Sequence, residues 1–380
     1  MTISSNINQR QRFIIHLRAE NKPLEHRRAL TPSVVGELIT QAGFTVYVED
    51  SPLSCFTAAE YREAGAVILP ENAWKESPND GRIIVGLKEM PEEDTFPLIH
   101  EHVQFAHCFK KQEGWERVLS RFIEGESTLY DLEFLEDEQG VRISSFGFYA
   151  GYVGACLGVK DWCFKKMNDE SKDMPGVKAF FDECELNNDV VMDLESVSTV
   201  KNITEPPRVL IIGSNGRCGK GAKEALSNVG IPKSHITEWG RTETSDPKNF
   251  KQIPQFDIFI NCIYLKDPIE PFVTMESLNY EQRKLTTIVD VSADTTNPHN
   301  PIPVYNIATV FDKPTVKVEV SKGPKLSVIS IDHLPSLLPR DASDFFATHL
   351  FKHLTNLPNR KEDPVWKRAE DLFKHHCDQL

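Results

Sequence analysis

Ionisable side chains follow several apolar segments in the first third of the chain, each where its segment ends. They are Arg18 after 12–17, Lys88 and Glu89 after 82–87, His107 after 102–106, and Glu133 after 128–132. If these segments are parallel strands of one sheet, their carboxyl ends meet at one edge, where open α/β sheets bind their ligands. One such lysine or histidine alone is usually a solvated or structural residue. Several strand ends that carry ionisable groups to one edge instead predict a functional site.

The residue types at this edge suit proton transfer beside a redox cofactor. Lys88 has Glu89 next to it and Glu133 on a neighbouring strand end, and nearby carboxylates and burial tune the proton affinity of an amine. His107 titrates near neutrality and can act as acid and base in turn. Two such groups suit amine oxidation, in which hydride loss leaves an imine that water must hydrolyse. Cations that suit substrate carboxylates also lie near the strand ends, namely Arg18, Lys22, Arg27, Arg28 and Lys110.

A metal site is the weaker interpretation of the histidines in this region. His100, Glu101 and His102 precede His107, but their spacing fits no standard zinc helix motif. No matching cluster of carboxylates accompanies them in the sequence. We therefore expect no metal.

A glycine-rich turn in the second half of the chain predicts a dinucleotide site. The stretch "RVLIIGSNGRCGKGAKEAL" has a buried apolar run, then Gly213, Gly216 and Gly219, then a helical pattern. Glycines let the backbone approach a pyrophosphate, and the following helix offers unpaired N–H groups. A glycine triplet alone could be any tight β–α turn. The following strand, however, ends at "TEWG" about 25 residues after Gly213, where a ribose-reading residue is expected.

The ribose position leaves the choice of nicotinamide dinucleotide open. NAD-binding folds usually place Asp or Glu at this strand end, but here Trp239 is followed by Gly240 and Arg241. Glu238 or Glu243 could accept from the 2′-hydroxyl, whereas Arg241 could instead meet a 2′-phosphate.

Two cysteines are expected to lie close to the glycine loop. A doubly wound sheet places Cys262, at the end of a later strand, near Cys218 in the loop. Two ordinary buried thiols are favoured over a redox-sensitive pair, because the cytosol is reducing.

Strand and helix patterns alternate through most of the chain and predict an α/β fold with mostly parallel sheets. A long helix over 145–167, rich in small residues, connects two Rossmann-like domains, and 168–207 is expected to be irregular or helical on the surface. The first domain comprises 1–145 and 336–380 and carries the substrate edge, and the second comprises 146–335 and binds the dinucleotide. Strands are predicted at 12–17, 44–50, 66–70, 81–89, 102–109, 128–135, 208–213, 235–240, 256–264, 286–294 and 326–334, and helices at 32–43, 57–65, 114–126, 219–230 and within 341–380.

Composition narrows the class of protein. A length of 380 residues allows two domains of ordinary size, and a net charge of −13 argues against a nucleic-acid partner. No apolar run reaches the roughly 18–20 residues of a membrane span, and eight scattered cysteines without C-x-x-C pairs suggest neither a zinc ribbon nor a secreted disulfide framework. The polar start "MTISSNINQR" and the end "DQL", which is no S-K-L signal, predict a cytoplasmic protein.

Longer blocks of sequence resemble one enzyme family. The chain is similar to fungal saccharopine dehydrogenases, NAD-dependent and L-lysine-forming, except over 165–207 and about the last 25 residues. The resemblance implies that saccharopine, NAD⁺ and water give L-lysine, 2-oxoglutarate and NADH, the last step of the aminoadipate route to lysine. It also implies two α/β domains facing a central cleft, as in alanine dehydrogenase and transhydrogenase, and a monomer. The blocks are "LRAENKPLEHRRALTP", "GLKEMPEEDTFPLIHEHVQFAHCFK", "TLYDLEFL", "FGFYAG", "IGSNGRCGKGA", "INCIYL", "VDVSADTTNPHNPIP" and "LSVISIDHLPSLLPR".

The resemblance also implies roles for single residues. Lys88 corresponds to the base that deprotonates the secondary amine, and His107 to the group that handles the protons of imine hydrolysis. Cys218 and Cys262 correspond to cysteines that can form a disulfide in this family. The expected substrate contacts are Arg27, Glu89, Gln112, Glu133, Arg142, Phe146, Ser292, Ala293 and Asp294. The expected cofactor contacts are Gly213, Gly216, Arg217, Gly240, Arg241, Thr244, Tyr264, Val291, Ile331, Asp332, His333 and Leu334.

One departure and two alternatives qualify this interpretation. The family ends its second Rossmann strand with Trp-Asp, whereas this chain has Trp239-Gly240, which keeps both NAD and NADP open. An alanine-dehydrogenase-like enzyme acting on a simpler amino acid would need fewer cations than this edge offers. A dinucleotide-binding regulator without catalysis would be expected to have lost some of Lys88, Glu89, His107 and Glu133, all of which are present.

Overall fold

The chain folds into two compact units, each built around one sheet. The computed structural model describes residues 12–22, 24–265, 267–293 and 299–380. One unit comprises residues 1–145 and 339–380, and the other comprises 146–338, so the chain returns to the first unit at 339, where the sequence suggested 336. Each unit contains a six-stranded sheet, as expected for an α/β protein with Rossmann-like domains.

The sheet of the first unit is parallel throughout, in the order β3-β2-β1-β4-β5-β6. The order reverses direction beside β1, the kind of switch point at which doubly wound folds bind ligands. Every strand is shorter than its apolar segment suggested, because the ladder stops before the polar strand ends. The strands are β1 (Ile14–Leu17), β2 (Thr45–Glu49), β3 (Val67–Leu69), β4 (Ile83–Val85), β5 (Glu101–Gln104) and β6 (Leu129–Asp131).

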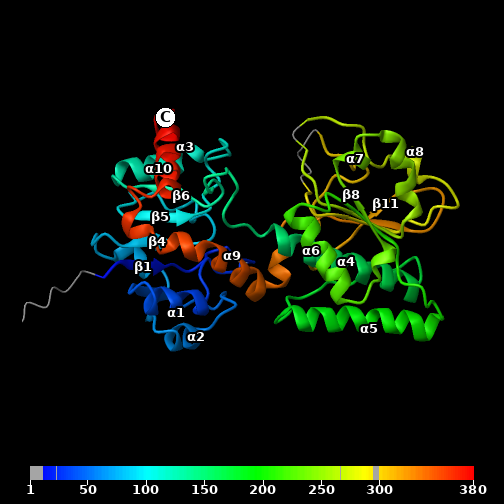
Figure 1. The fold of residues 1–380 in the computed structure, drawn as a ribbon, viewed down its shortest axis with the longest axis horizontal. Helices are drawn as coiled ribbons and strands as arrows, with labels where there is room; N and C mark the ends of the chain where they lie inside the picture. The colour runs from blue at the N-terminus through cyan, green and yellow to red at the C-terminus, as the bar shows by residue number, and fades with distance from the viewer. Residues whose placement is uncertain (1–11, 23, 266, 294–298) are drawn as a thin grey trace, which may run out of the picture. The chain divides into compact units, whose positions relative to one another are not determined.

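Four helices of this unit, α1, α2, α3 and α10, lie toward the two ends of its sheet (Figure 1). α1 (Pro32–Thr40) and α2 (Ala58–Glu63) lie near β2 and β3, and α3 (Trp115–Glu124) and α10 (Pro364–Cys377) lie near β6. α9 (Pro339–Leu354) brings the chain back and contacts α1. Phe373 of α10 packs edge-on against Phe122 of α3 at 5.8 Å between ring centroids, so the C-terminal helices complete this core.

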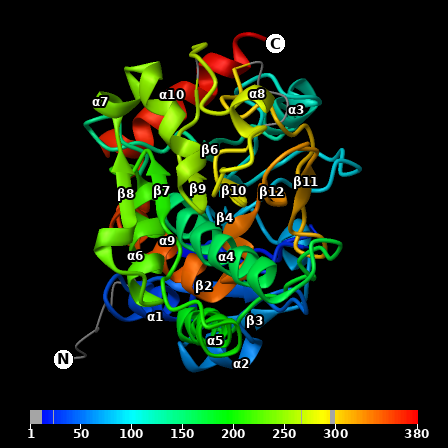
Figure 2. The same cartoon turned by 90° about the vertical axis from the view of Figure 1, so that its right-hand side faces the viewer.

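The sheet of the second unit has the order β11-β12-β10-β9-β7-β8, which Figure 2 shows from one side to the other. Only the edge strand β11 is antiparallel, and it was not predicted because its three residues, Val-Lys-Val, are too few to show a strand pattern. The strands are β7 (Val209–Ile212), β8 (Ile236–Trp239), β9 (Ile258–Asn261), β10 (Thr287–Asp290), β11 (Val316–Val318) and β12 (Leu326–Ile329).

Two long helices cover one face of this second sheet. α4 (Gly147–Met167) packs on β9, β10 and β12 and is itself covered by α5 (Glu183–Lys201), within the segment 168–207 that had no clear pattern (Figure 2). α6 (Arg217–Asn228) packs closely on α4, since a Cβ at Gly221 would lie 1.9 Å from the Phe148 carbonyl oxygen. The remaining helices are α7 (Arg241–Thr244), α8 (Met275–Leu278) and the 3₁₀ turns Ala73–Glu76, Lys233–His235, Pro247–Gln255, Leu334–Leu337 and Leu357–Asn359.

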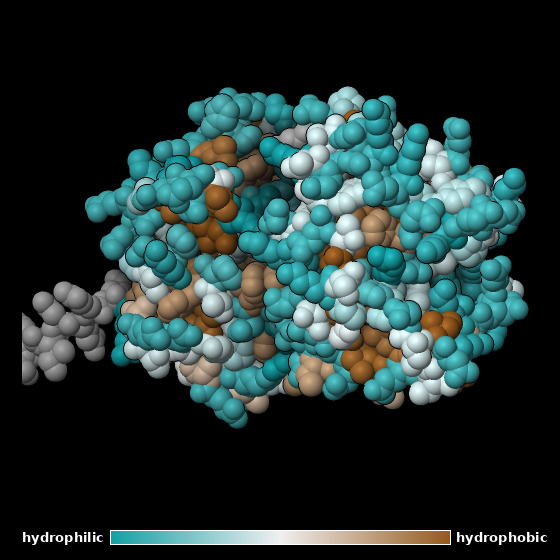
Figure 3. Space-filling view, turned by 45° about the vertical axis from the view of Figure 1, so that its right-hand side comes forward, coloured by the Kyte–Doolittle hydropathy of each residue, from teal (hydrophilic) through white to brown (hydrophobic). Residues whose placement is uncertain are grey.

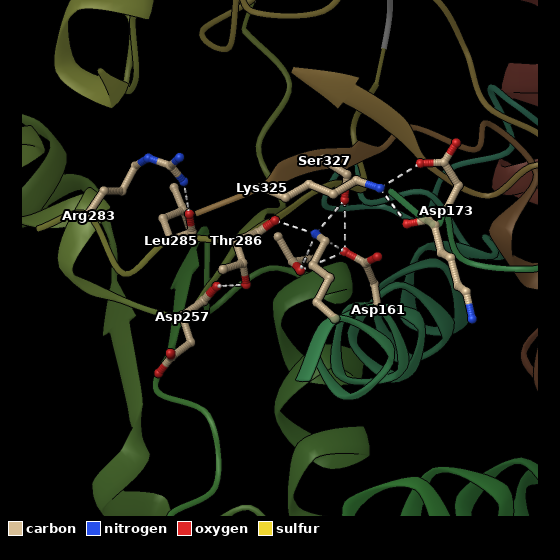
Figure 4. A network of polar contacts seen from close by, with 11 residues as sticks. Asp161, Asp173, Asp257, Arg283, Leu285, Thr286, Lys325 and Ser327 are labelled. Atoms are coloured by element: carbon tan, nitrogen blue, oxygen red, sulfur yellow. Dashed lines mark hydrogen bonds and ion pairs between the residues drawn. The ribbon is translucent and has the colours of Figure 1, made fainter. Parts of the chain in front are cut away.

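A buried network joins α4 to the amino ends of β10 and β12. The Lys165 ammonium donates to Asp161 Oδ2 and Ser327 Oγ, both at 2.6 Å, to the Thr286 carbonyl oxygen, and to Thr287 Oγ1 at 3.2 Å. The Thr287 and Ser327 hydroxyls donate to Asp161 at 2.7 and 2.8 Å, and Figure 4 shows Asp161 and Ser327 facing each other. Each polar group therefore has partners, which burial requires.

The visible surface in Figure 3 is mainly hydrophilic, with hydrophobic side chains in small separate patches. Within the described residues, no helix is long and apolar enough to cross a membrane.

Candidate active site

The ionisable strand ends of the first unit meet at one sheet edge, as the sequence predicted. β1, β4, β5 and β6 are neighbours in the sheet and run parallel, so Arg18, Lys88, His107 and Glu133 all follow carboxyl ends. We call this edge the polar rim.

Arg18 and Glu20 hold the backbone around Lys88 from two sides. Glu20 accepts the N–H groups of Leu87 and Lys88 at 2.6 and 2.9 Å, and Arg18 donates to the Lys88 carbonyl oxygen. Arg18 is fully buried and fits because residue 86 is glycine; a Cβ there would lie 2.4 Å from Arg18 Nε. Arg18 thus supports the rim through its contacts with Ala19, Lys88 and Gln104, and its role in binding a substrate carboxylate stays a prediction.

Lys88 lies partly buried above a buried ion pair. Arg27 donates to both carboxylate oxygens of Glu25, at 2.7 and 2.6 Å. Burial and the positive charge of Arg27 lower the pKa of Lys88, and the negative charges of Glu25 and Glu89 only partly oppose them. Within the residues that the structure describes, the Lys88 ammonium forms no hydrogen bond or ion pair. A lysine in this state can lose its proton more easily than an exposed one.

Glu89 connects Lys22 with His107. Its carboxylate forms an ion pair with Lys22 Nζ at 2.7 Å and contacts His107 Nδ1 directly. Burial alone would raise the pKa of Glu89, but these two hydrogen bonds outweigh it and bring the pKa well below its usual range. A charged Glu89 therefore fixes the orientation of the His107 ring.

The backbone of His107 is itself unusual. Its φ of +50° lies in the left-handed region, which non-glycine residues rarely adopt. Such strained residues persist where the surroundings hold them, and they concentrate at functional sites. The imidazole stacks on Phe105 at 6.1 Å between ring centroids, and its side chain is 36% exposed, so a ligand can reach it.

The carboxylates after β6 form the far side of the rim. Glu133 pairs with Lys110 at 2.6 Å and with Arg142 at 3.5 Å. Asp131 accepts the N–H groups of Glu133 and Ala106 at 2.9 and 3.3 Å, and burial raises its pKa to about 6. The sequence analysis did not single out Asp131, although it ends the same strand as Glu133.

A cavity of about 400 Å³ opens beside the rim within the first unit. Its walls include Lys22, Glu89, His107 and Gln112. The side-chain oxygen of Gln112 is buried without a hydrogen-bond partner, which leaves it an acceptor for a ligand in the cavity. Phe146, another expected substrate residue, begins α4 in the second unit.

Other candidates of the first unit have structural surroundings. The Arg28 guanidinium donates to the Glu49 carbonyl oxygen at 3.4 Å and lies over the Tyr61 ring. His102 is fully buried against the rings of Trp74 and Phe122, and burial lowers its pKa. The described residues contain no group of His, Cys, Asp and Glu that could hold a metal ion.

The glycine loop of the second unit has the close packing that a dinucleotide site requires. Gly213 has a φ of +85°, and a Cβ there would lie 2.5 Å from the Ile263 side chain. A Cβ at Gly219 would lie 2.3 Å from the Gly213 carbonyl oxygen, so the helix starts directly against the loop. Gly216 caps α6, so the amino end of this helix, with its positive dipole end, adjoins the glycine loop. Loop and helix thus offer a cradle for a pyrophosphate.

The end of β8 adjoins this loop. The Trp239 carbonyl oxygen accepts the Gly213 N–H at 2.9 Å. Gly240 caps the short helix α7, and its N–H donates to Glu243 Oε2 at 2.7 Å. The Thr244 hydroxyl donates to the Gly240 carbonyl oxygen at 2.9 Å, and Arg241 is exposed.

The other expected contacts of the second unit follow β9, β10 and β12, at the same edge as the loop. Tyr264 follows β9, and Val291, Ser292 and Ala293 follow β10; Asp294 lies outside the described residues. Ile331, Asp332, His333 and Leu334 follow β12; Asp332 and His333 contact each other at 2.6 Å, whereas Ile331 and Leu334 are buried.

Asn261, Asp290 and Tyr305 form a polar cluster that was not predicted from the sequence. Asp290 accepts from Asn261 Nδ2 at 2.9 Å and from the Tyr305 hydroxyl at 2.7 Å. Burial raises the pKa of Asp290. The sequence does contain a signal for two of them, because the buried strands "FIN" and "IVD" each end in a polar residue, Asn261 and Asp290.

The disulfide implied by the resemblance is absent from the structure, because Cys218 and Cys262 are both free thiols. Burial raises the pKa of Cys218 to about 11 and that of Cys262 well above its ordinary value. Thiols in this state are weak nucleophiles at neutral pH.

Known proteins share this arrangement and much of the sequence. Residues 16–153 match the family "Alanine dehydrogenase/PNT, N-terminal domain". An L-alanine dehydrogenase structure superposes with a TM-score of 0.68 at 16% identity, covering 95% of this chain and 94% of that one, which shows a shared fold.

Full-length relatives are much closer in sequence. The saccharopine dehydrogenase (NAD(+), L-lysine-forming) of Candida glabrata is 59% identical over 95% of this chain and 96% of its own. The protein of the same name from Candida albicans is 57% identical over 97% of this chain and 98% of its own. Identity this high over nearly the whole of both chains shows that the chain belongs to the family of L-lysine-forming saccharopine dehydrogenases.

Proposed function

We propose that the protein oxidises saccharopine with a nicotinamide dinucleotide and water to L-lysine, 2-oxoglutarate and the reduced cofactor, the last step of lysine synthesis from aminoadipate. The observation that carries the proposal is the polar rim. A lysine with a lowered pKa and a carboxylate-bound histidine lie on adjacent strand ends of one sheet. Proton transfer at an amine and hydrolysis of an imine need one group of each kind.

Lys88 is the proposed base for the secondary amine of saccharopine. The N–H proton passes to the neutral Lys88 amine, the C–H hydride is lost to the cofactor, and a C=N bond forms. The lowered pKa of Lys88 favours the neutral amine that this step requires. The hydrogen bonds of Glu20 to the backbone N–H groups of Leu87 and Lys88 keep the base in place.

His107 is the proposed acid and base of the hydrolysis. It accepts a proton from water as the oxygen adds to the imine carbon, and passes that proton to the nitrogen. It then takes the hydroxyl proton of the resulting carbinolamine and passes it to the nitrogen too, as the C=O bond forms and the C–N bond breaks. L-lysine leaves with its amine, and the former imine carbon becomes the keto group of 2-oxoglutarate. Glu89 fixes the ring through Nδ1, so Nε2 is the nitrogen that exchanges protons.

The remaining rim residues are proposed to bind substrate. Arg27 and Arg142 suit carboxylates, and Gln112 brings a buried oxygen without a partner to the cavity wall. Glu89 and Glu133 balance these cations beside Lys88 and Lys110. Phe146, Ser292, Ala293 and Asp294 stay as further predicted contacts.

The dinucleotide is proposed to bind at the glycine loop, where it supplies the hydride acceptor. The closely packed glycines and the amino end of α6, with its positive dipole end, fit a pyrophosphate. Arg217, Thr244, Tyr264, Val291 and Ile331–Leu334 are the proposed contacts around it. The same proposal includes a monomer, which light scattering of the purified chain tests, and a cytoplasmic location, which fluorescence microscopy of a tagged chain tests.

Absorbance at 340 nm tests the reaction directly. Purified protein with L-lysine and 2-oxoglutarate should consume reduced cofactor, and a Lys88→Met/His107→Gln variant should not. Lys367→Met, at an exposed position on α10, is the matched control and should keep full activity. A purified, folded protein that consumes neither NADH nor NADPH would contradict the proposal.

A further inference from the structure

Among the residues that the structure describes, the carboxylates at the ribose end of the proposed dinucleotide site are already engaged by other groups. In NAD-binding folds an Asp or Glu at the end of the second strand accepts from the ribose 2′-hydroxyl. Here that strand is β8, and Gly240 stands at its end, in contact with the glycine loop through the Trp239 carbonyl oxygen.

The two carboxylates nearest this position already have other partners. Glu238 lies on β8 and pairs with Lys223 of α6 at 2.8 Å. Glu243 accepts the Gly240 N–H at 2.7 Å and thereby caps α7. A 2′-hydroxyl would have to displace one of these contacts to gain an acceptor.

The backbone does not require glycine at position 240. Its φ is −117°, which any residue adopts, and a Cβ would lie 3.7 Å from Glu243 Oε2 and 3.9 Å from Asn215 Nδ2. These are ordinary contact distances, so an aspartate would fit. The glycine therefore reflects the chemistry of the site and not a packing constraint, unlike Gly219 in the adjacent loop.

Arg241 places a cation where the carboxylate is missing. It is the first residue of α7, directly after Gly240, and is exposed. A guanidinium binds a phosphate through two parallel hydrogen bonds, and an aspartate at 240 would have repelled that phosphate. Attraction and the removal of repulsion both favour the same ligand.

We propose that this ribose site recognises a 2′-phosphate, so that the protein prefers NADP(H) to NAD(H). The inference rests on the proposed dinucleotide site and disagrees with the cofactor in the names of the relatives. Gly240 leaves room for the phosphate, and Arg241 binds it. A charge-assisted contact of this kind corresponds to a roughly ten- to hundredfold difference in affinity.

Fluorescence titration of the full chain with NADPH and NADH, without substrate, tests the inference. NADPH should bind at least tenfold more tightly, and 2′,5′-ADP should compete better than 5′-ADP. Arg241→Ala should weaken NADPH roughly tenfold or more and leave NADH unchanged. Gly240→Asp should reverse the preference.

Lys233→Ala is the matched control, because it removes the same charge at the amino end of β8, the opposite edge of the sheet. It should leave both affinities unchanged, and thermal melting of each variant shows whether it folds. Equal loss of NADPH binding in Arg241→Ala and Lys233→Ala would overturn the inference in favour of general charge attraction.

The outcomes separate this inference from the proposed function. Tighter binding of NADH overturns the 2′-phosphate site and leaves the reaction standing. Tighter binding of NADPH without turnover of L-lysine and 2-oxoglutarate supports the site and contradicts the reaction. Binding of neither nucleotide overturns both.

Discussion

Lys88 and Lys165 are both partly buried lysines with lowered pKa values, yet their surroundings differ. Burial is the main cause of the lowered pKa at both. Lys165 donates to four oxygens, one of them a carboxylate oxygen of Asp161. Lys88 forms no hydrogen bond among the described residues, and the guanidinium of Arg27 lowers its pKa further.

The comparison separates a structural lysine from a reactive one. Partners on every side keep the Lys165 ammonium charged and fixed, and they connect α4 to β10 and β12. The rim instead leaves the Lys88 amine without acceptors among the described residues, at a cost in stability, and its neighbour Glu89 lines a cavity of ligand size. A lowered pKa alone would not distinguish the two residues; the number of acceptors does.

The largest expected effect is the loss of catalysis in Lys88→Met. Removal of the base should lower kcat about 10²- to 10⁴-fold, whereas thermal stability should stay the same or rise because a poorly solvated charge is removed. Steady-state kinetics and thermal unfolding of the same preparation measure both. A variant that loses stability together with activity would show that Lys88 is structural, like Lys165.

Lys165→Met should have the opposite pattern. It leaves the Asp161 carboxylate buried without its cation and should lower the free energy of unfolding by about 3–5 kcal/mol. Activity per folded molecule should be retained, because Lys165 lies at the opposite edge of its sheet from the glycine loop.

Two further variants sharpen this result. Lys166→Met changes the next residue, which lies over the Trp162 ring, and should cost less than about 1 kcal/mol. Asp161→Asn combined with Lys165→Met should recover part of the lost stability. Urea unfolding of all three variants measures these changes in the free energy of unfolding. Equal losses in Lys165→Met and Lys166→Met would contradict a stabilising ion pair between Lys165 and Asp161.

Glu20→Gln tests whether the rim positions its lysine. A glutamine can accept only one of the two N–H groups of Leu87 and Lys88, and its amide would face the other. We expect kcat to fall about 10- to 100-fold with little change in KM. Because the base is still present, kcat should keep its dependence on pH, which Lys88→Met would lose. If Glu20→Gln lowers only the thermal stability and leaves kcat and KM unchanged, Glu20 has a purely structural role.

The residues of the polar rim could be predicted from the sequence, whereas the buried contacts that hold the backbone could not. Strand ends at Lys88, His107 and Glu133 could be placed because parallel strands share an edge, whatever their exact length. The inward turn of Arg18 could not be predicted, since it depends on space above Gly86 that only the packed structure reveals. The Lys165 network was equally invisible, because its members are far apart in sequence and follow no motif.

Asp131 extends the comparison to a carboxylate and gives the smallest expected effect. Unlike Asp161, it is buried without a paired lysine, and its folded pKa of about 6 lies above the ordinary value of 3.8. The folded protein therefore binds the proton more tightly, so this contribution to stability is present below pH 3.8 and is lost as the pH rises through about 6. The full loss at neutral pH is at most about 3 kcal/mol.

Asp131→Asn removes this charge but also an acceptor for the Ala106 or Glu133 N–H, so we expect a net gain of only about 1 kcal/mol at pH 7.5 and none at pH 4. Urea unfolding of both proteins at the two pH values measures it, with Asp371→Asn on the exposed face of α10 as the control. A difference that is independent of pH would mean that Asp131 is stabilised as a carboxylate after all. The rim would then tolerate a buried carboxylate as well as the Lys165 network does. The lack of a paired cation at Asp131 would no longer distinguish the two regions.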